Sequence, residues 1–113
     1  MTRLMHWQEQ IEQELAKASE GLQRKNDGLA RVCARRAVAL AAQHWAKQRH
    51  MSDWQGDTIH QLRKIQEQAT FPLSVREAAQ RLLTKVTEQA QLPMTTDPIT
   101  DARIILDHLN SDT

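Results

Sequence analysis

The segment Gly28–His50, which reads GLARVCARRAVALAAQHWAKQRH, decides the fold of this chain. It contains no proline, and alanine, the strongest helix former, fills seven of its positions. At about 100° per residue these alanines are spread around the whole circumference of a helix. Small side chains on every side allow several helices to approach one backbone closely. We therefore predict a long central helix, one face of which could also take part in dimer contact.

Four further segments carry apolar residues at helical spacing, and strand-type alternation never exceeds four residues. The predicted helices cover about Leu4–Glu20, Asp53–Thr70, Val75–Gln91 and Pro98–Leu109. The first has a heptad-like apolar stripe, which suits a helix that lies along another helix. Short loops between long amphipathic helices favour antiparallel neighbours. The sequence thus predicts one all-α domain over 1–113, an up-down four-helix bundle with a short fifth helix at the C-terminus.

Several residues are suited to begin or end these helices. Asp27 is expected to cap the central helix, and Ser52 or Asp53 the next one, which Pro72 would end. The spacing of Ser74 and Glu77 predicts a capping box. Asp97 followed by Pro98 is typical of an N-cap with proline at the first helical position.

Composition excludes several classes of protein. The 113 residues include 15 Lys and Arg against 14 Asp and Glu, a net charge of +1, so no overall field attracts nucleic acid or a membrane. Cys33 is the single cysteine, which excludes an internal disulfide and a cysteine-based zinc cluster. The chain has no glycine-rich phosphate loop and no metal-binding histidine motif, so we expect no metal and no cofactor. No secretory or membrane-spanning segment is visible, and a cytoplasmic location is the expectation.

The central segment is basic, whereas both ends of the chain are acidic. Between Asp27 and His50 there are five cationic residues and one carboxylate, while the last 17 residues carry four carboxylates and one arginine. Intramolecular pairing and solvation would explain this pattern. A basic strip that binds phosphate or an acidic partner would explain it too. The candidate binding residues are Arg31, Arg35, Arg36, His44, Trp45 and Arg49.

Two polar residues, Arg36 and His44, share a face of the central helix with Cys33. Either Arg36 lies at the edge of that face and His44 makes one interior hydrogen bond, or the two form a small basic pocket. Cys33 is either a small buried hydrophobe or a thiol activated by the neighbouring arginine.

The stretch Gly28–Ala42 resembles the second helix of HEPN-type helical bundles, and Asp97–Ala102 is similar to a segment of small bacterial members of that family. The resemblance extends to the order of helices over most of the chain. That family includes ribonucleases, partners of nucleotidyltransferases and many members of unknown role, and its members are commonly dimers. The resemblance therefore implies a homodimeric helical bundle.

The catalytic pattern of the family, an arginine followed four to six residues later by a histidine, matches once, at Arg103 and His108. On a regular helix these residues are separated by about 140°, so their side chains should diverge. We therefore expect a non-catalytic module that binds a partner protein or nucleic acid as a dimer. The alternatives are a metal-independent endoribonuclease of a toxin–antitoxin system and a structural subunit of a larger assembly.

Overall fold

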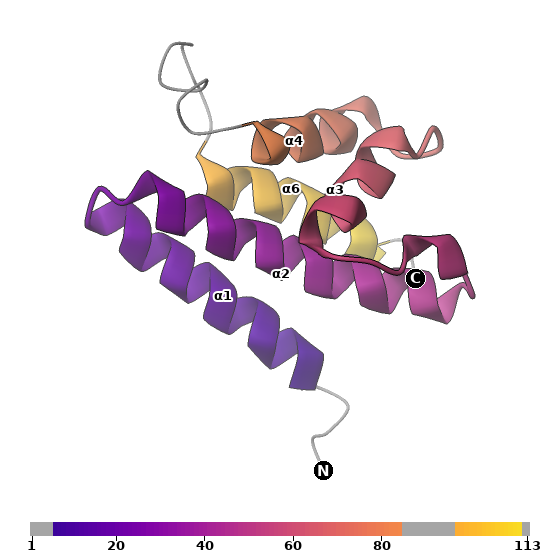
Figure 1. Ribbon diagram of the computed structural model, residues 1–113, viewed down its shortest axis with the longest axis horizontal. Coiled ribbons are helices and arrows are strands. Elements are labelled where there is room, and N and C mark those ends of the chain that lie inside the picture. Colours follow the sequence, from indigo (N-terminus) through magenta and orange to yellow (C-terminus); the bar gives the residue numbers. More distant parts are fainter. Residues whose placement is uncertain (1–5, 85–96, 112–113) are drawn as a thin grey trace.

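The structure is a computed structural model that describes residues 6–84 and 97–111. These residues form five α-helices and one short 3-10 helix, and none of them lies in a β-strand (Figure 1). The elements are α1 (His6–Gln23), α2 (Asp27–Gln48), η2 (Ser52–Trp54), α3 (Thr58–Glu67), α4 (Leu73–Leu83) and α6 (Pro98–Ser111). The all-α prediction is confirmed.

Helix α2 is the central element of the fold, as its alanine content predicts. It contacts α1 along most of its length and also packs against α3 and α6, while α4 packs mainly on α3 and α6. Figure 1 shows α1 and α2 as an antiparallel hairpin, with α3, α4 and α6 gathered on the far side of α2. All seven alanines of α2 are buried within this single chain: Ala30, Ala34, Ala37, Ala39, Ala41, Ala42 and Ala46. They therefore serve helix packing inside one molecule and leave no alanine face for a second copy.

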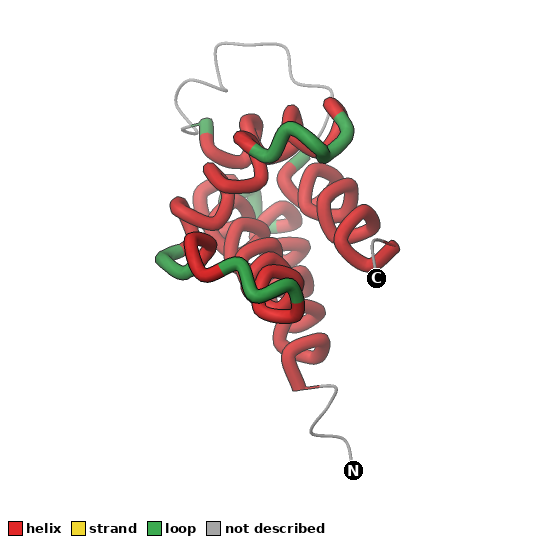
Figure 2. Tube along the Cα trace, turned by 90° about the vertical axis from the view of Figure 1, so that its right-hand side faces the viewer, coloured by secondary structure: helices red, strands yellow, loops and turns green. Residues whose placement is uncertain are grey.

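The heptad-like stripe of α1 is likewise buried against α2. Ile11, Leu15 and Ala18 have exposed fractions of 6%, 3% and 0%. The N-terminal turns of α1 project beyond the other helices (Figure 2). Trp7, on this projecting end, is half-buried and packs against the core.

The helix predicted over Asp53–Thr70 is divided in two, which corrects the sequence interpretation. Chain direction changes in the linker between η2 and α3, where Gly56 has a φ of 156°. Asp57, and not Ser52 or Asp53, caps α3, because its side chain accepts a hydrogen bond of 2.9 Å from the N–H of His60. The break places Trp54 in the core, with its ring centroid 5.0 Å from that of Trp45.

Other helix ends also differ from the predictions. Asn26 caps α2 by accepting from the N–H of Leu29 at 3.1 Å, so Asp27 is already helical. Helix α4 begins at Leu73, directly after Pro72 and without a side-chain cap, so the capping box at Ser74 and Glu77 is wrong. A helix that starts two residues early leaves Ser74 inside the first turn, where it cannot act as the N-cap.

The C-terminal helices show one correction and one confirmation. Helix α4 ends at Leu83 and not at Gln91, since Thr84 is extended; residues 85–91 of the predicted helix lie outside the described part. Asp97 accepts from the N–H of Thr100 at 2.7 Å, and Pro98 is the first residue of α6. The predicted N-cap and its proline are confirmed, and the helix runs two residues past the predicted end.

Replacing Gly56 with alanine should destabilise the fold by about 1–3 kcal/mol, because its φ of 156° disfavours any side chain. The added Cβ would also lie 2.7 Å from Cδ2 of His60. Gly28→Ala is the matched control: its Cβ meets nothing closer than 3.7 Å in the first turn of α2, so stability should stay the same or rise by up to about 1 kcal/mol. Urea unfolding followed by circular dichroism measures both, and equal stabilities of the two variants would contradict the assignment of strain to Gly56.

Candidate functional site

Two of the six candidate binding residues, Arg31 and Arg35, hold the C-terminal end of α4. Nη1 of Arg31 donates a hydrogen bond of 2.9 Å to the carbonyl oxygen of Arg81. Nε of Arg35 donates to the carbonyl of Leu82, and its Nη2 donates to that of Thr84 at 3.3 Å. The last carbonyls of a helix have no intrahelical partner, and they form the negative end of its dipole. Arg31 and Arg35 satisfy these carbonyls from α2, so both serve the fold.

An ion pair with a buried carboxylate lies beside this anchor. Nε of Arg81 on α4 is 2.9 Å from Oδ1 of Asp101 on α6, and the carboxylate of Asp101 is 1% exposed. Arg31 is 5% exposed. Burial lowers the pKa of Arg31, as does the neighbouring Arg35, whereas Asp101 raises it by attraction. Charged groups of α2, α4 and α6 thus meet at one buried junction.

Sequence reasoning did not single out Arg81 or Asp101. One signal was present, because Asp101 lies within the apolar stripe of α6 between Pro98 and Ile105, a position where a solvated aspartate is not expected. A carboxylate on a buried face requires a cationic partner, which only the packing of α4 on α6 supplies.

The remaining candidates of α2 lie in three separate places. The ring of His44 stacks on Trp7, with centroids 3.9 Å apart and an interplanar angle of 19°. The guanidinium of Arg49 lies 4.4 Å from the centroid of Trp45 and donates to the backbone oxygen of that residue. Arg36 is exposed elsewhere on α2. The six residues therefore do not form one continuous basic strip.

The candidate catalytic pair is not assembled within the chain. Arg103 faces α1, where its Nη1 lies 3.3 Å from Oε2 of Glu12. His108 packs edge-on against Phe71, just before α4, with ring centroids 4.8 Å apart. The two side chains leave α6 in different directions, as the spacing of five residues along a helix requires.

One face of α2 is only partly covered by the described helices. We call it the open face; it consists of Leu29, Val32, Arg36, Leu40 and Gln43, at spacings of three and four residues. Leu29 and Val32 are each 39% exposed, which is unusual in a helix whose other large apolar residues are covered. A hollow of about 350 Å³ begins at Arg36 and continues to Gln43, with Gln10, Gln13 and Glu14 of α1 as one wall and Thr58 of α3 at the other.

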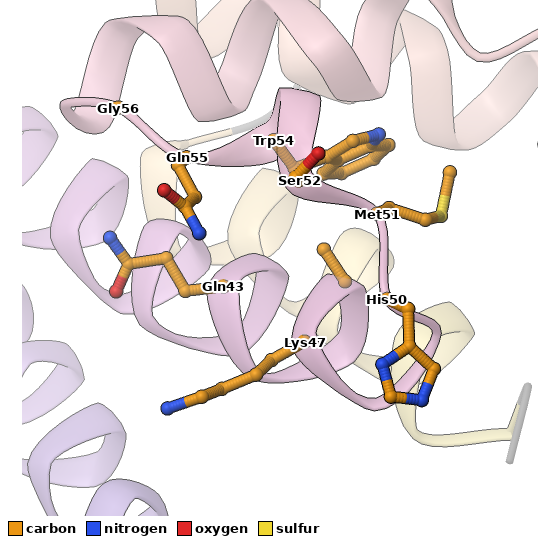
Figure 3. A pocket seen from close by; sticks show the side chains of 9 residues that line it. Gln43, Lys47, His50, Met51, Ser52, Trp54, Gln55 and Gly56 are labelled. Atoms are coloured by element: carbon orange, nitrogen blue, oxygen red, sulfur yellow. The ribbon is translucent and has the colours of Figure 1, made fainter.

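A larger hollow of about 490 Å³ lies between the C-terminal turns of α2 and the segment around η2 (Figure 3). We call it the η2 pocket. Figure 3 shows Gln43 and Gln55 close together at one end and His50 with Met51 at the other, while Trp54 and Ser52 lie along the upper side. It is lined by Gln43, Ala46, Lys47, His50, Met51, Ser52, Trp54, Gln55 and Gly56. None of these residues was among the candidates chosen from the sequence, because the pocket exists only through the break before α3.

Cys33 is a buried residue of the core, 1% exposed. Burial raises the pKa of its thiol, and the neighbouring Glu14 raises it further by repulsion and hydrogen bonding, which outweighs the opposing effect of Arg36. The structure therefore supports the interpretation of Cys33 as a small hydrophobe.

Within residues 6–84 and 97–111, no three side chains of His, Cys, Asp or Glu gather as metal ligands would. No helix in the same residues is both long enough and apolar enough to cross a membrane. No family model, no curated protein and no solved structure matches this chain.

Replacing Arg31 or Arg35 with glutamine should destabilise the protein, because the carbonyls at the end of α4 lose their donors. We expect a loss of about 2–4 kcal/mol for Arg31→Gln, since Asp101 also loses a cationic neighbour in a buried place. Arg36→Gln, one residue further along the same helix but exposed, is the control and should change stability by less than about 0.5 kcal/mol. Chemical denaturation of the three variants tests this, and an equal effect of all three would disprove the anchor.

Native protein should resist modification of Cys33 by a thiol reagent, because a buried thiol with a raised pKa holds little thiolate at neutral pH. Reaction with Ellman's reagent should become fast only after unfolding in guanidinium. A Val32→Cys, Cys33→Ala double variant places the thiol on the open face and should react in the native state. Rapid native reaction of the unaltered chain would contradict the buried position.

Proposed function

We propose that this chain is a non-catalytic interaction module of HEPN-like type, which binds an amphipathic helix of a partner protein on the open face of α2. The observation that carries the proposal is the exposure of Leu29 and Val32 beside Arg36 on the most central helix of the fold. Large apolar side chains grouped on an otherwise polar surface are a common feature of protein contact sites. The HEPN-like resemblance, an alanine-rich second helix within an up-down bundle, agrees with this role, since some members act as partners of other proteins.

The shape of the open face favours a helix as the bound element. From Leu29 to Gln43 it runs for about 21 Å, close to four helical turns. Its second half is a trough, with α1 on one side and the start of α3 on the other. An amphipathic helix laid in such a trough would bury its apolar stripe there.

Charge favours an acidic partner. Arg36 is exposed and forms no ion pair with any residue of the described part, and it lies between Val32 and Leu40 on the same face. A carboxylate of the partner placed opposite Arg36 would complement its positive charge. A second copy of this chain is a less suitable occupant of this face, because it would bring its own Arg36 to a surface whose one lining carboxylate, Glu14, already pairs with Lys17 at 3.6 Å.

Nucleic acid is also less favoured, because Arg31 and Arg35 are occupied at the end of α4 and do not reach out as a strip. Ribonuclease activity would need Arg103 and His108 to come together, and each is engaged with a different neighbour. The homodimer expected from the sequence remains a prediction, which light scattering tests alongside the peptide-binding experiment.

The test uses two synthetic helical peptides of equal length with the same leucine stripe, one carrying glutamates and the other lysines on the flanking positions. Fluorescence anisotropy should show binding of the acidic peptide and at least about tenfold weaker binding of the basic one. Arg36→Glu should reverse this preference, and Val32→Asp should abolish binding of the acidic peptide. Arg63→Glu, an exposed change on α3 outside the open face, is the matched control and should preserve it.

Three outcomes would overturn the proposal. Equal binding of both peptides would contradict the proposed role of Arg36 in recognising an acidic partner. Salt-sensitive binding of a single-stranded RNA oligonucleotide that Arg36→Glu abolishes would indicate a nucleic-acid surface. Light scattering that gives twice the mass of one chain, and a return to one chain's mass in Val32→Asp, would assign the open face to a homodimer.

A further inference from the structure

We propose that the η2 pocket is a preformed binding site for an apolar group that carries a carboxylate. The inference goes beyond the proposed function: Gln43 borders both surfaces, but Leu29, Val32 and Arg36, which carry the proposed function, do not line this pocket. It rests on three observations: a wall that is held in place, an apolar floor, and a rim with hydrogen-bond donors but no carboxylate.

The wall is held in place by α3. Nε2 of His60 lies 2.9 Å from the backbone oxygen of Asp53, and Nζ of Lys64 lies 2.8 Å from Oδ2 of the same residue. Gln61, fully buried, donates a hydrogen bond from its side chain to the backbone oxygen of Trp54. Three side chains from two successive turns of one helix thus fix a segment that has little regular structure of its own.

The backbone at both borders of the pocket is also unusual. His50 has a φ of 56° and Gly56 a φ of 156°. Residues in such conformations persist only where surrounding contacts enforce them, and they are frequent at ligand sites. The segment packs onto α2 through Trp54 and borders the hollow beside it, so a ligand would meet a preformed site.

The floor of the pocket is apolar. Ala46 and Trp54 line it and are 3% and 2% exposed, and the half-buried Met51 stands beside them. The volume of about 490 Å³ is within the usual range for small-ligand sites. An apolar group would therefore contact mainly the side chain of Met51, with only the small accessible edges of Trp54 and Ala46 behind it.

The rim selects an anion. Lys47 supplies an ammonium group, His50 an imidazole, and Gln43 and Gln55 supply amide donors at the opposite end (Figure 3). No lining residue is acidic, and the two nearby aspartates are engaged outside the pocket, Asp53 with Lys64 and Asp57 with the N–H of His60. A carboxylate beside Lys47 or His50 would gain a cationic partner at the rim, while an attached apolar body reaches Met51.

The experiment titrates 4-phenylbutyrate into the ¹⁵N-labelled full chain and follows the indole N–H of Trp54 and the side-chain amides of Gln43 and Gln55 by NMR. These three signals should shift together, and the neutral analogue 4-phenylbutan-1-ol should bind several-fold more weakly. Lys47→Gln should weaken phenylbutyrate binding about three- to fivefold, as expected for an exposed charge pair. Lys25→Gln, an exposed lysine before α2, is the matched control and should leave the affinity unchanged.

A second arm identifies the source of the carboxylate. A short peptide that ends in phenylalanine with a free C-terminus is compared with the same peptide as its C-terminal amide. Tighter binding of the free-ended peptide than of phenylbutyrate would assign the pocket to a chain terminus, and the reverse would assign it to a small acid; both results support the site.

The proposal would be overturned if the Trp54, Gln43 and Gln55 signals do not move at phenylbutyrate concentrations on the order of 10 mM. Equal affinity for the acid and the alcohol, or for the unaltered protein and Lys47→Gln, would show an adventitious apolar contact only. Because the open-face variants Val32→Asp and Arg36→Glu should keep full phenylbutyrate binding, failure of this site and failure of the proposed function can be told apart.

Discussion

The structure depends on the close approach of several helices to α2. Alanine at seven positions makes this approach possible, because a helix backbone can lie nearer to a neighbour when the side chains between them are small. The larger core residues come from the helices that surround α2 and from its own Val38 and Trp45. Aromatic rings fill the space at its C-terminal end, where Trp45 packs against Trp54 and Phe71. A bulky residue in place of Ala34 or Ala37, both fully buried, would push α1 or its other neighbours outwards.

Close packing also explains the basic character of the central segment. Helix α4 ends near α2 with carbonyl groups that water reaches poorly, and an arginine is long enough to donate to them from the neighbouring helix. The buried Asp101 balances the charge that these arginines bring into the interior. A charge pattern that is typical of a phosphate-binding strip thus arises, in large part, because the carbonyl groups at the end of α4 require donors. The proposed function consequently rests on the smaller set of groups that remain exposed.

The two surfaces that carry the proposals differ in origin. The open face exists because the short helices α3 and α4 cover only part of α2 and leave Leu29 and Val32 in contact with solvent. The η2 pocket exists because the chain leaves helical geometry between Met51 and Asp57 and is fixed there by side chains of α3. The first surface is apolar with one cation, and the second is a hollow with several donors, so they suit occupants of different size and chemistry.

By itself, the sequence determined the helical class, the central place of α2, the buried stripe of α1 and the cap at Asp97, because each depends on local propensity and on residues three or four positions apart. It also indicated that Arg103 and His108 would diverge, since helix geometry alone separates them. Only the tertiary structure decided that Arg31 and Arg35 serve the end of α4, that Asp101 is buried beside Arg81, and that the helix predicted from Asp53 breaks to insert Trp54 into the core. These outcomes depend on groups that are distant in the chain; Arg31 and Arg81 are 50 positions apart. The free energy of burying a tryptophan or of pairing a buried charge also exceeds the small local preferences for helix or turn that a sequence displays.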